Sequence, residues 1–250
     1  MVLVGSGAVN HEELVKLAER YFGNIKSGSR ESKIIKPTFV GSEVRARYDN
    51  HPTAHMALAV EGVSWDSPDY WPLLVAQSIT GSWDRTTGSA AHSASKLAQE
   101  ISKHNLANSF MSFNTSYSDT GLFGTYLVSE NLEHLDDLMH FVLQEWHRLS
   151  INVTPAQVFR AKNQLKSALL LTLDGSTPIA EEIGRHVLVY GRRLSPWEID
   201  GLIESVTPEQ VMQAAKTFIY DREVAVVGYG PVEGMQDYNR VRSAMAPIYY

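Results

Sequence analysis

Residues 130–134 of this sequence contain an almost complete zinc-binding pattern. They read Glu-Asn-Leu-Glu-His, so one change, from Glu130 to histidine, would give His-x-x-Glu-His. In that pattern two histidines one helical turn apart bind the metal, and the glutamate beside the second histidine acts as the general base. The stretch is therefore a damaged metal site, a different site, or part of an ordinary helix.

The periodicity of residues 131–149 favours the ordinary helix. At 100° per residue, the large apolar side chains from Leu132 to Leu149 fall on one broad arc. Five polar side chains fall on the opposite arc: Glu133, Asp137, His140, Gln144 and His147. His134 lies off the centre of that polar arc. We predict that the polar arc faces water and that this stretch holds no metal.

Two other pairs of residues invite a metal interpretation and do not support it. His51 and His55 flank Pro52 and precede an alternating run, which indicates extended chain and a separation of about 13 Å, too far to share one ion. Glu182 and His186 have helical i, i+4 spacing. Because the sequence indicates no third ligand, a surface ion pair is the expected role of that second pair.

The segment Gly5-Ser6-Gly7 raises a nucleotide-binding hypothesis, because glycines before a helix N-terminus can hold a phosphate. The third glycine of the dinucleotide pattern would be expected at position 10, which is Asn10. A strand-to-helix turn explains the glycines better. The sequence also has no G-x-S-x-G segment and no Gly-Lys-Ser/Thr phosphate loop.

Composition excludes several classes of function. The chain has 250 residues, 44% of them hydrophobic, a net charge of −6 and no cysteine. Thiolate zinc sites, disulfides and cysteine nucleophiles are therefore excluded. Charges of both signs are interspersed without a basic patch, so no nucleic-acid partner is expected. No apolar run has the length of about 20 residues that a membrane span needs. The N-terminus resembles neither a secretory signal nor a mitochondrial presequence, so the protein is cytosolic or the chain begins partway through a longer one.

The elements that would position these residues indicate an α+β fold. Strands are predicted near residues 2–4, 44–48, 55–60, 109–117, 122–128 and 224–228. Helices are predicted over residues 10–22, 67–79, 93–101, 131–149, 154–173, 178–190, 196–204 and 208–219. A run of strands, then helices and a closing strand predicts a mixed, mostly antiparallel sheet with helices packed on one face. No linker is strong enough to divide the chain, so one domain over residues 1–250 is expected.

Five longer segments carry a family resemblance. They are NHEELVKLAERYFG, SWDRTTG, SFMSFNTSYSDTGLFGTYLV, QVFRAKNQLKSALLLTLDGSTPIAEEIGR and VAVVGYGPVEGM. Together they resemble the second half of the β-type branch of the mitochondrial processing peptidases, within the pitrilysin-type zinc metallopeptidases. That family also includes the first core subunit of respiratory complex III. The resemblance covers nearly the whole chain.

The resemblance implies two similar α+β halves, with the zinc-binding His-x-x-Glu-His in the first. This sequence has no such motif, so no zinc ligand, catalytic residue or cofactor is assigned to it, and the chain alone is expected to be no enzyme. Related second halves offer an arginine and, seven residues later, a tyrosine that bind the scissile carbonyl. The matching positions are Lys103 and Phe110, or Ser102 and Asn108 with one deletion, so neither alignment keeps the pair. We interpret the absence of this arginine and tyrosine to mean that the domain has no transition state to stabilise.

The function implied is that of a noncatalytic C-terminal domain in a two-subunit zinc metalloendopeptidase, where it helps to enclose presequences. The partners implied are its own N-terminal half, an α subunit or second core subunit, other complex III subunits and presequence peptides. The location implied is the mitochondrial matrix or the matrix side of the inner membrane. Two alternatives remain, a purely structural core subunit of complex III and, far more weakly, a nucleotide-binding domain using Gly5 to Asn10. The residues that touch substrate are not indicated.

Overall fold

The structure is a computed structural model that describes residues 1–26, 35 and 37–246. Contacts between residues divide the chain into two units. One unit combines Met1–Lys36 with Lys166–Gly201, and the other combines Pro37–Leu165 with Leu202–Tyr250. The larger unit contains the sheet, and the smaller one is helical.

The larger unit is built on one six-stranded sheet with the order β1-β6-β2-β5-β4-β3. The strands are β1 (Ser42–Arg47), β2 (Ala54–Gly62), β3 (Ser82–Asp84), β4 (Ser109–Ser116), β5 (Gly121–Ser129) and β6 (Val224–Gly230). Within the part of the chain that the structure describes, β1 and β6 pair in parallel and the other four pairings are antiparallel. The predicted mixed, mostly antiparallel sheet is confirmed.

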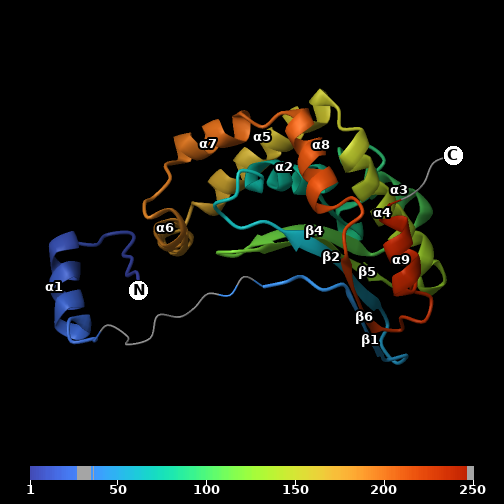
Figure 1. Cartoon of the computed structure of the whole chain (residues 1–250), viewed down its shortest axis with the longest axis horizontal. Coiled ribbons are helices and arrows are strands. Elements are labelled where there is room, and N and C mark those ends of the chain that lie inside the picture. The colour runs from blue at the N-terminus through green and yellow to red at the C-terminus, as the bar shows by residue number, and fades with distance from the viewer. Residues whose placement is uncertain (27–34, 36, 247–250) are drawn as a thin grey trace. The chain divides into compact units, whose positions relative to one another are not determined.

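Helices cover one face of this sheet (Figure 1). The α-helices of the chain are α1 (His11–Phe22), α2 (Tyr70–Thr80), α3 (Lys96–His104), α4 (Leu135–Ile151), α5 (Pro155–Thr172), α6 (Ser176–Tyr190), α7 (Pro196–Glu204), α8 (Pro208–Phe218) and α9 (Tyr238–Ala244). The 3₁₀ turns are η1 (Arg85–Thr87) and η2 (Leu132–His134). Helix α2 contacts β4, α8 contacts β2, and α4 packs on α3 and α8. The prediction of helices on one face is confirmed.

The core lies between the sheet and these helices. Strand β2 alternates strictly between buried and half-buried residues, so Leu58 and its alternate neighbours point to the helices. The ring of Phe123 on β5 lies 6.0 Å from that of Trp146 on α4, measured between centroids, and both are buried. Each large apolar side chain buried in this way contributes about 1.5–3 kcal/mol. The apolar periodicity of the sequence therefore sets which face of each element is inside.

Several predicted elements differ from the structure. Residues 2–4 form no strand, because no neighbouring strand in the described part of the chain pairs with them. Helix α4 begins at Leu135, after the 3₁₀ turn η2, rather than at residue 131. Strand β3 and helix α9 were not predicted. Strand β3 has only three residues and owes its conformation to pairing with β4, which local sequence does not encode.

The smaller unit contains two helices with unusually exposed apolar side chains. Helix α1 is capped by Asn10, whose side chain accepts hydrogen bonds from the amides of Glu12 and Glu13. Neither α1 nor α6 contains a buried residue. On α1 the exposed residues include Tyr21 and Phe22.

Candidate functional site

The face of the sheet opposite the helices is the candidate functional site, and we call it the open face. Every second strand residue lies on it because side chains alternate along a strand. Six large apolar residues on it are between 38% and 56% exposed: Val44, Tyr48, Met111, Tyr126, Val227 and Tyr229. Along β1, β2, β4, β5 and β6, Glu61 is the only Asp, Glu, Lys or Arg on this face. The open face is thus an apolar and aromatic surface rather than a charged one.

Tyr229 on β6 is the centre of an aromatic cluster on the open face. Its ring centroid lies 5.2 Å from that of Tyr48, 5.1 Å from His51 and 6.3 Å from His55. Its hydroxyl shares a hydrogen bond of 3.2 Å with Nε2 of His51. The Nδ1 atom of His55 shares one of 2.7 Å with the hydroxyl of Tyr126. These bonds hold the rings in fixed orientations, ready to pack against an apolar or cationic side chain.

The prediction that His51 and His55 lie on one stretch of extended chain is wrong. Residues 49–53 form a turn and bends before β2 begins. Strand β6 lies between β1 and β2, so it places Tyr229 against both imidazoles. A tyrosine more than 170 residues away in the sequence thereby links the two histidines. Sequence spacing gave no signal for this arrangement.

The part of the chain that the structure describes does not fit a zinc ion. No group of three or more His, Cys, Asp or Glu residues there could hold a metal. In the near-motif, Nδ1 of His134 lies 2.8 Å from a carboxylate oxygen of Asp137, and both side chains are at least half exposed. Of the polar arc, Glu133, Asp137, His140 and Gln144 are exposed as expected.

His147 departs from the predicted polar arc of α4, because it is buried. Its ring lies 5.6 Å from that of Tyr220, which follows α8. Burial lowers the pKa of His147 below its ordinary value of 6.5. Helix α4 packs on α8 and also contacts the sheet through Trp146 and Phe123, so it is buried over a wider arc than a single apolar stripe indicates.

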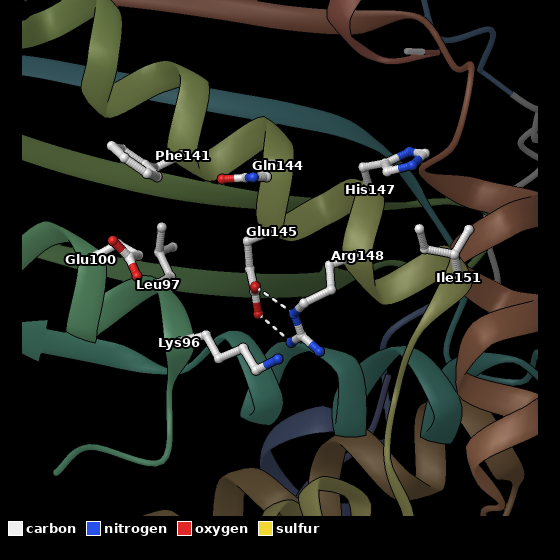
Figure 2. A pocket seen from close by; sticks show the side chains of 9 residues that line it. All are labelled: Lys96, Leu97, Glu100, Phe141, Gln144, Glu145, His147, Arg148 and Ile151. Atoms are coloured by element: carbon white, nitrogen blue, oxygen red, sulfur yellow. Dashed lines mark hydrogen bonds and ion pairs between the residues drawn. The ribbon is translucent and has the colours of Figure 1, made fainter. Parts of the chain in front are cut away.

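A pocket of about 460 Å³ lies between α3 and α4 (Figure 2). Its walls include Lys96 from α3 and the buried pair Glu145 and Arg148 from α4. The Arg148 guanidinium donates to both carboxylate oxygens of Glu145, at 2.7 and 2.5 Å, and also to the carbonyl oxygen of Asn152. These bonds join α4 to the turn before α5, so the pair acts as a structural brace.

The positions that match the carbonyl-binding pair of related second halves do not come together as a site. Lys103 is exposed on the last turn of α3, whereas Phe110 is 2% exposed in the core. Under the other alignment, the hydroxyl of Ser102 accepts a hydrogen bond from the backbone amide of Ala90. The side-chain oxygen of Asn108 accepts one from the backbone amide of Glu130. Both alternatives serve local structure.

The expected ion pair between Glu182 and His186 is not formed in the described part of the chain. Glu182 pairs with Arg193 instead, at 3.2 Å. Desolvation is the main cause that lowers the pKa of His186, and the nearby charge of Glu182 partly opposes it. Among the helices of residues 1–26 and 37–246, none is long and apolar enough to cross a membrane.

Comparisons with known proteins agree with this architecture. Residues 1–165 match the family model described as the peptidase M16 inactive domain. The chain is 59% identical, over its whole length, to the mitochondrial-processing peptidase subunit beta of Blastocladiella emersonii and covers 54% of that protein. It is 44% identical to the human protein of the same name over 98% of its length, covering 50% of that protein. It thus spans about half the length of these relatives.

The fold also matches a chain in a solved structure titled complex III2 from Candida albicans, Inz-5 bound. The TM-score is 0.87 and the sequence identity is 35%. The match covers 96% of the present chain and 57% of that one.

Proposed function

The chain belongs to the M16 peptidase family through the family's inactive domain, and from that premise we propose that it is the noncatalytic C-terminal domain of a β-type mitochondrial processing peptidase. In this proposal it helps to enclose and bind the presequences that the full heterodimer cleaves. The protein acts in the mitochondrial matrix or at the matrix side of the inner membrane, and it also serves as a core subunit of complex III. Zinc is held by the N-terminal half of the longer protein.

The observation that carries this proposal is the open face. A chamber wall needs a broad surface that contacts many different peptides without strict sequence demands, and apolar and aromatic side chains provide such contacts. Met111, Tyr126 and Tyr229 supply them here.

Helix α1 supports the proposed contact with an N-terminal half. It is amphipathic, yet no residue on it is buried, and Leu17, Tyr21 and Phe22 are more than 40% exposed. Contiguous exposed apolar side chains mark surfaces that another polypeptide covers. We propose that the remaining half of the longer protein covers this helix. The α subunit, or the second core subunit, then faces the open face across the chamber.

A second candidate is a purely structural core subunit of the ubiquinol–cytochrome c reductase complex. The likeness to a chain of complex III2 favours it. The discriminating feature lies in the other half, where an intact His-x-x-Glu-His supports the peptidase and a degraded one supports the scaffold. Cleavage of a presequence peptide by the full-length protein mixed with an α subunit tests this directly. Absence of cleavage with intact zinc loading would reject the peptidase role.

The role of the open face is tested by placing a positive charge on it. Tyr229→Lys should raise the KM for a basic presequence peptide about tenfold, because the new charge repels the peptide and the aromatic contact is lost. Gln144→Lys is the matched control, since it adds the same charge on the exposed side of α4. Equal KM values for the two variants would exclude the open face as the binding wall.

A further inference from the structure

The pocket between α3 and α4 belongs to the helix layer of the larger unit, on the opposite side of the sheet from the open face (Figure 1). Its volume of about 460 Å³ lies within the range of about 300–1,000 Å³ that small-molecule sites occupy. One side of α4, from Phe141 to Ile151, forms one wall, and the first turn of α3, from Lys96 to Glu100, forms the other. The presequence wall proposed above does not include this pocket.

Three apolar side chains line part of the pocket. Leu97 is buried, Phe141 packs partly buried against the core, and Ile151 remains 56% exposed at the end of α4. The ring of Phe141 is stacked on the imidazole of His104, with centroids 5.7 Å apart and planes 14° apart, and its centroid lies 5.9 Å from that of His140. Neither histidine lines the pocket, so they fix the phenyl ring from outside it. The ring is therefore held in place to pack against an apolar ligand.

The charged side chains of the pocket leave one cation uncompensated. The Glu145 carboxylate is neutralised by the two hydrogen bonds from Arg148, and Figure 2 shows the Lys96 side chain extending toward this ion pair. Lys96 has no ion-pair partner in the part of the chain that the structure describes. Glu100, four residues after Lys96, instead lies 3.5 Å from Nε2 of His104. Near the ion pair, two cations therefore stand against one carboxylate.

We propose that the pocket between α3 and α4 binds a small monocarboxylate with an apolar or aromatic body, whose carboxylate accepts hydrogen bonds from the ammonium of Lys96 while its body packs on Phe141. Charge-assisted hydrogen bonds of this kind are stronger than neutral ones. A cationic ligand fits this end of the pocket poorly, because the Glu145 carboxylate is already paired with Arg148. An anion without an apolar body would leave the phenyl ring uncovered.

A ligand-observed NMR titration of the full-length protein with its α subunit tests the pocket, with 3-phenylpropanoate as the probe. A ligand of this size should bind with a Kd of about 1 mM. The amide 3-phenylpropanamide has the same body without the charge, and acetate has the charge without the body. Each should bind about tenfold more weakly than the carboxylate. An amide that binds as tightly as 3-phenylpropanoate would overturn the proposal, and so would the absence of carboxylate binding at about 10 mM.

Two substitutions on α3 assign the binding to this pocket. Lys96→Met removes the ammonium from an exposed position and keeps the length of the side chain, so it should raise the Kd of 3-phenylpropanoate about tenfold. Lys103→Met is the matched control, because it removes the same charge from the same helix at a residue that does not line the pocket, and the Kd should stay unchanged. Equal Kd values for the two variants, at the melting temperature of the wild type, would overturn the proposal.

Discussion

Glu145 and Arg148, one turn apart on α4, form an ion pair through two hydrogen bonds, in which Glu145 is buried and Arg148 is partly buried. The guanidinium donates through Nε and Nη2 to separate carboxylate oxygens, at 2.7 and 2.5 Å, and the two side chains are 5% and 15% exposed. The pair closes one wall of the pocket between α3 and α4 (Figure 2). Burying such a pair costs desolvation energy, so the intact pair adds little net stability, but removal of one partner leaves a buried charge uncompensated.

Breaking this pair on one side should destabilise the fold strongly. Arg148→Met leaves the Glu145 carboxylate buried without its cation, and we expect a loss of about 3 kcal/mol in the free energy of unfolding. The double variant with Glu145→Leu should recover more than half of this loss, because no charge is then left buried. Urea unfolding at neutral pH measures both. Additive losses in the double variant would contradict the ion-pair explanation.

The buried His147 should make stability depend on pH. Its pKa in the folded state lies below the unfolded value of about 6.5, so the unfolded state binds more protons as the pH falls. The contribution of His147 to the free energy of unfolding should therefore be fully present above about pH 7. It should decrease as the pH falls through 6.5 to the lower pKa of the folded state.

The contribution of His147 can be isolated with a matched variant on the same helix. His147→Gln should reduce the loss of stability between pH 7 and pH 5, while His140→Gln, at an exposed position, should leave it unchanged. Denaturant titrations at several pH values provide the measurement. Parallel pH profiles for wild type and His147→Gln would show that other groups control the acid sensitivity.

The near-motif of residues 130–134 should be dispensable. The joint replacement of Glu133, Asp137 and His140 by uncharged residues removes exposed side chains, one of which bonds His134 at the surface. Surface changes and exposed ion pairs of this kind are worth about 0.5–1 kcal/mol. We expect the melting temperature, zinc content and presequence cleavage of the assembled protein to stay close to wild type. A loss of bound zinc would restore the metal interpretation.

Gly124 should tolerate no side chain. A Cβ atom there would lie 2.4 Å from the carbonyl oxygen of Leu58 and 2.4 Å from the ring of Phe113, which covers the glycine on the open face. Gly124→Ala should cost about 1–3 kcal/mol, as overpacking does elsewhere. Gly201→Ala on α7 is the control, because nothing lies within 4 Å of its Cβ position and alanine favours helix. Thermal unfolding of both variants distinguishes crowding from a general effect of glycine replacement.

The types and buried faces of most of the longer elements follow from local sequence. Alternation along β2 and the apolar arc of α4 set which side of each element is inside, and both are read from residues close together in the chain. The capping box of Thr207 and Gln210 starts α8 at Pro208, where the predicted helix over residues 208–219 begins. The missing His-x-x-Glu-His motif likewise underlies the expectation that this chain has no catalytic centre of its own.

Only the tertiary structure decided which residues meet. Tyr229 links His51 and His55 because β6, from the far end of the chain, inserts between β1 and β2. Among the described strands, none pairs with the outer side of β4 beyond Met111, because β3 ends there. Strand pairing joins residues far apart in sequence, and its register depends on the packing of the whole sheet rather than on any local pattern. The sequence by itself therefore determined most of the longer elements and their buried faces, whereas short β3, the burial of His147 and the aromatic cluster arise only from the assembled fold.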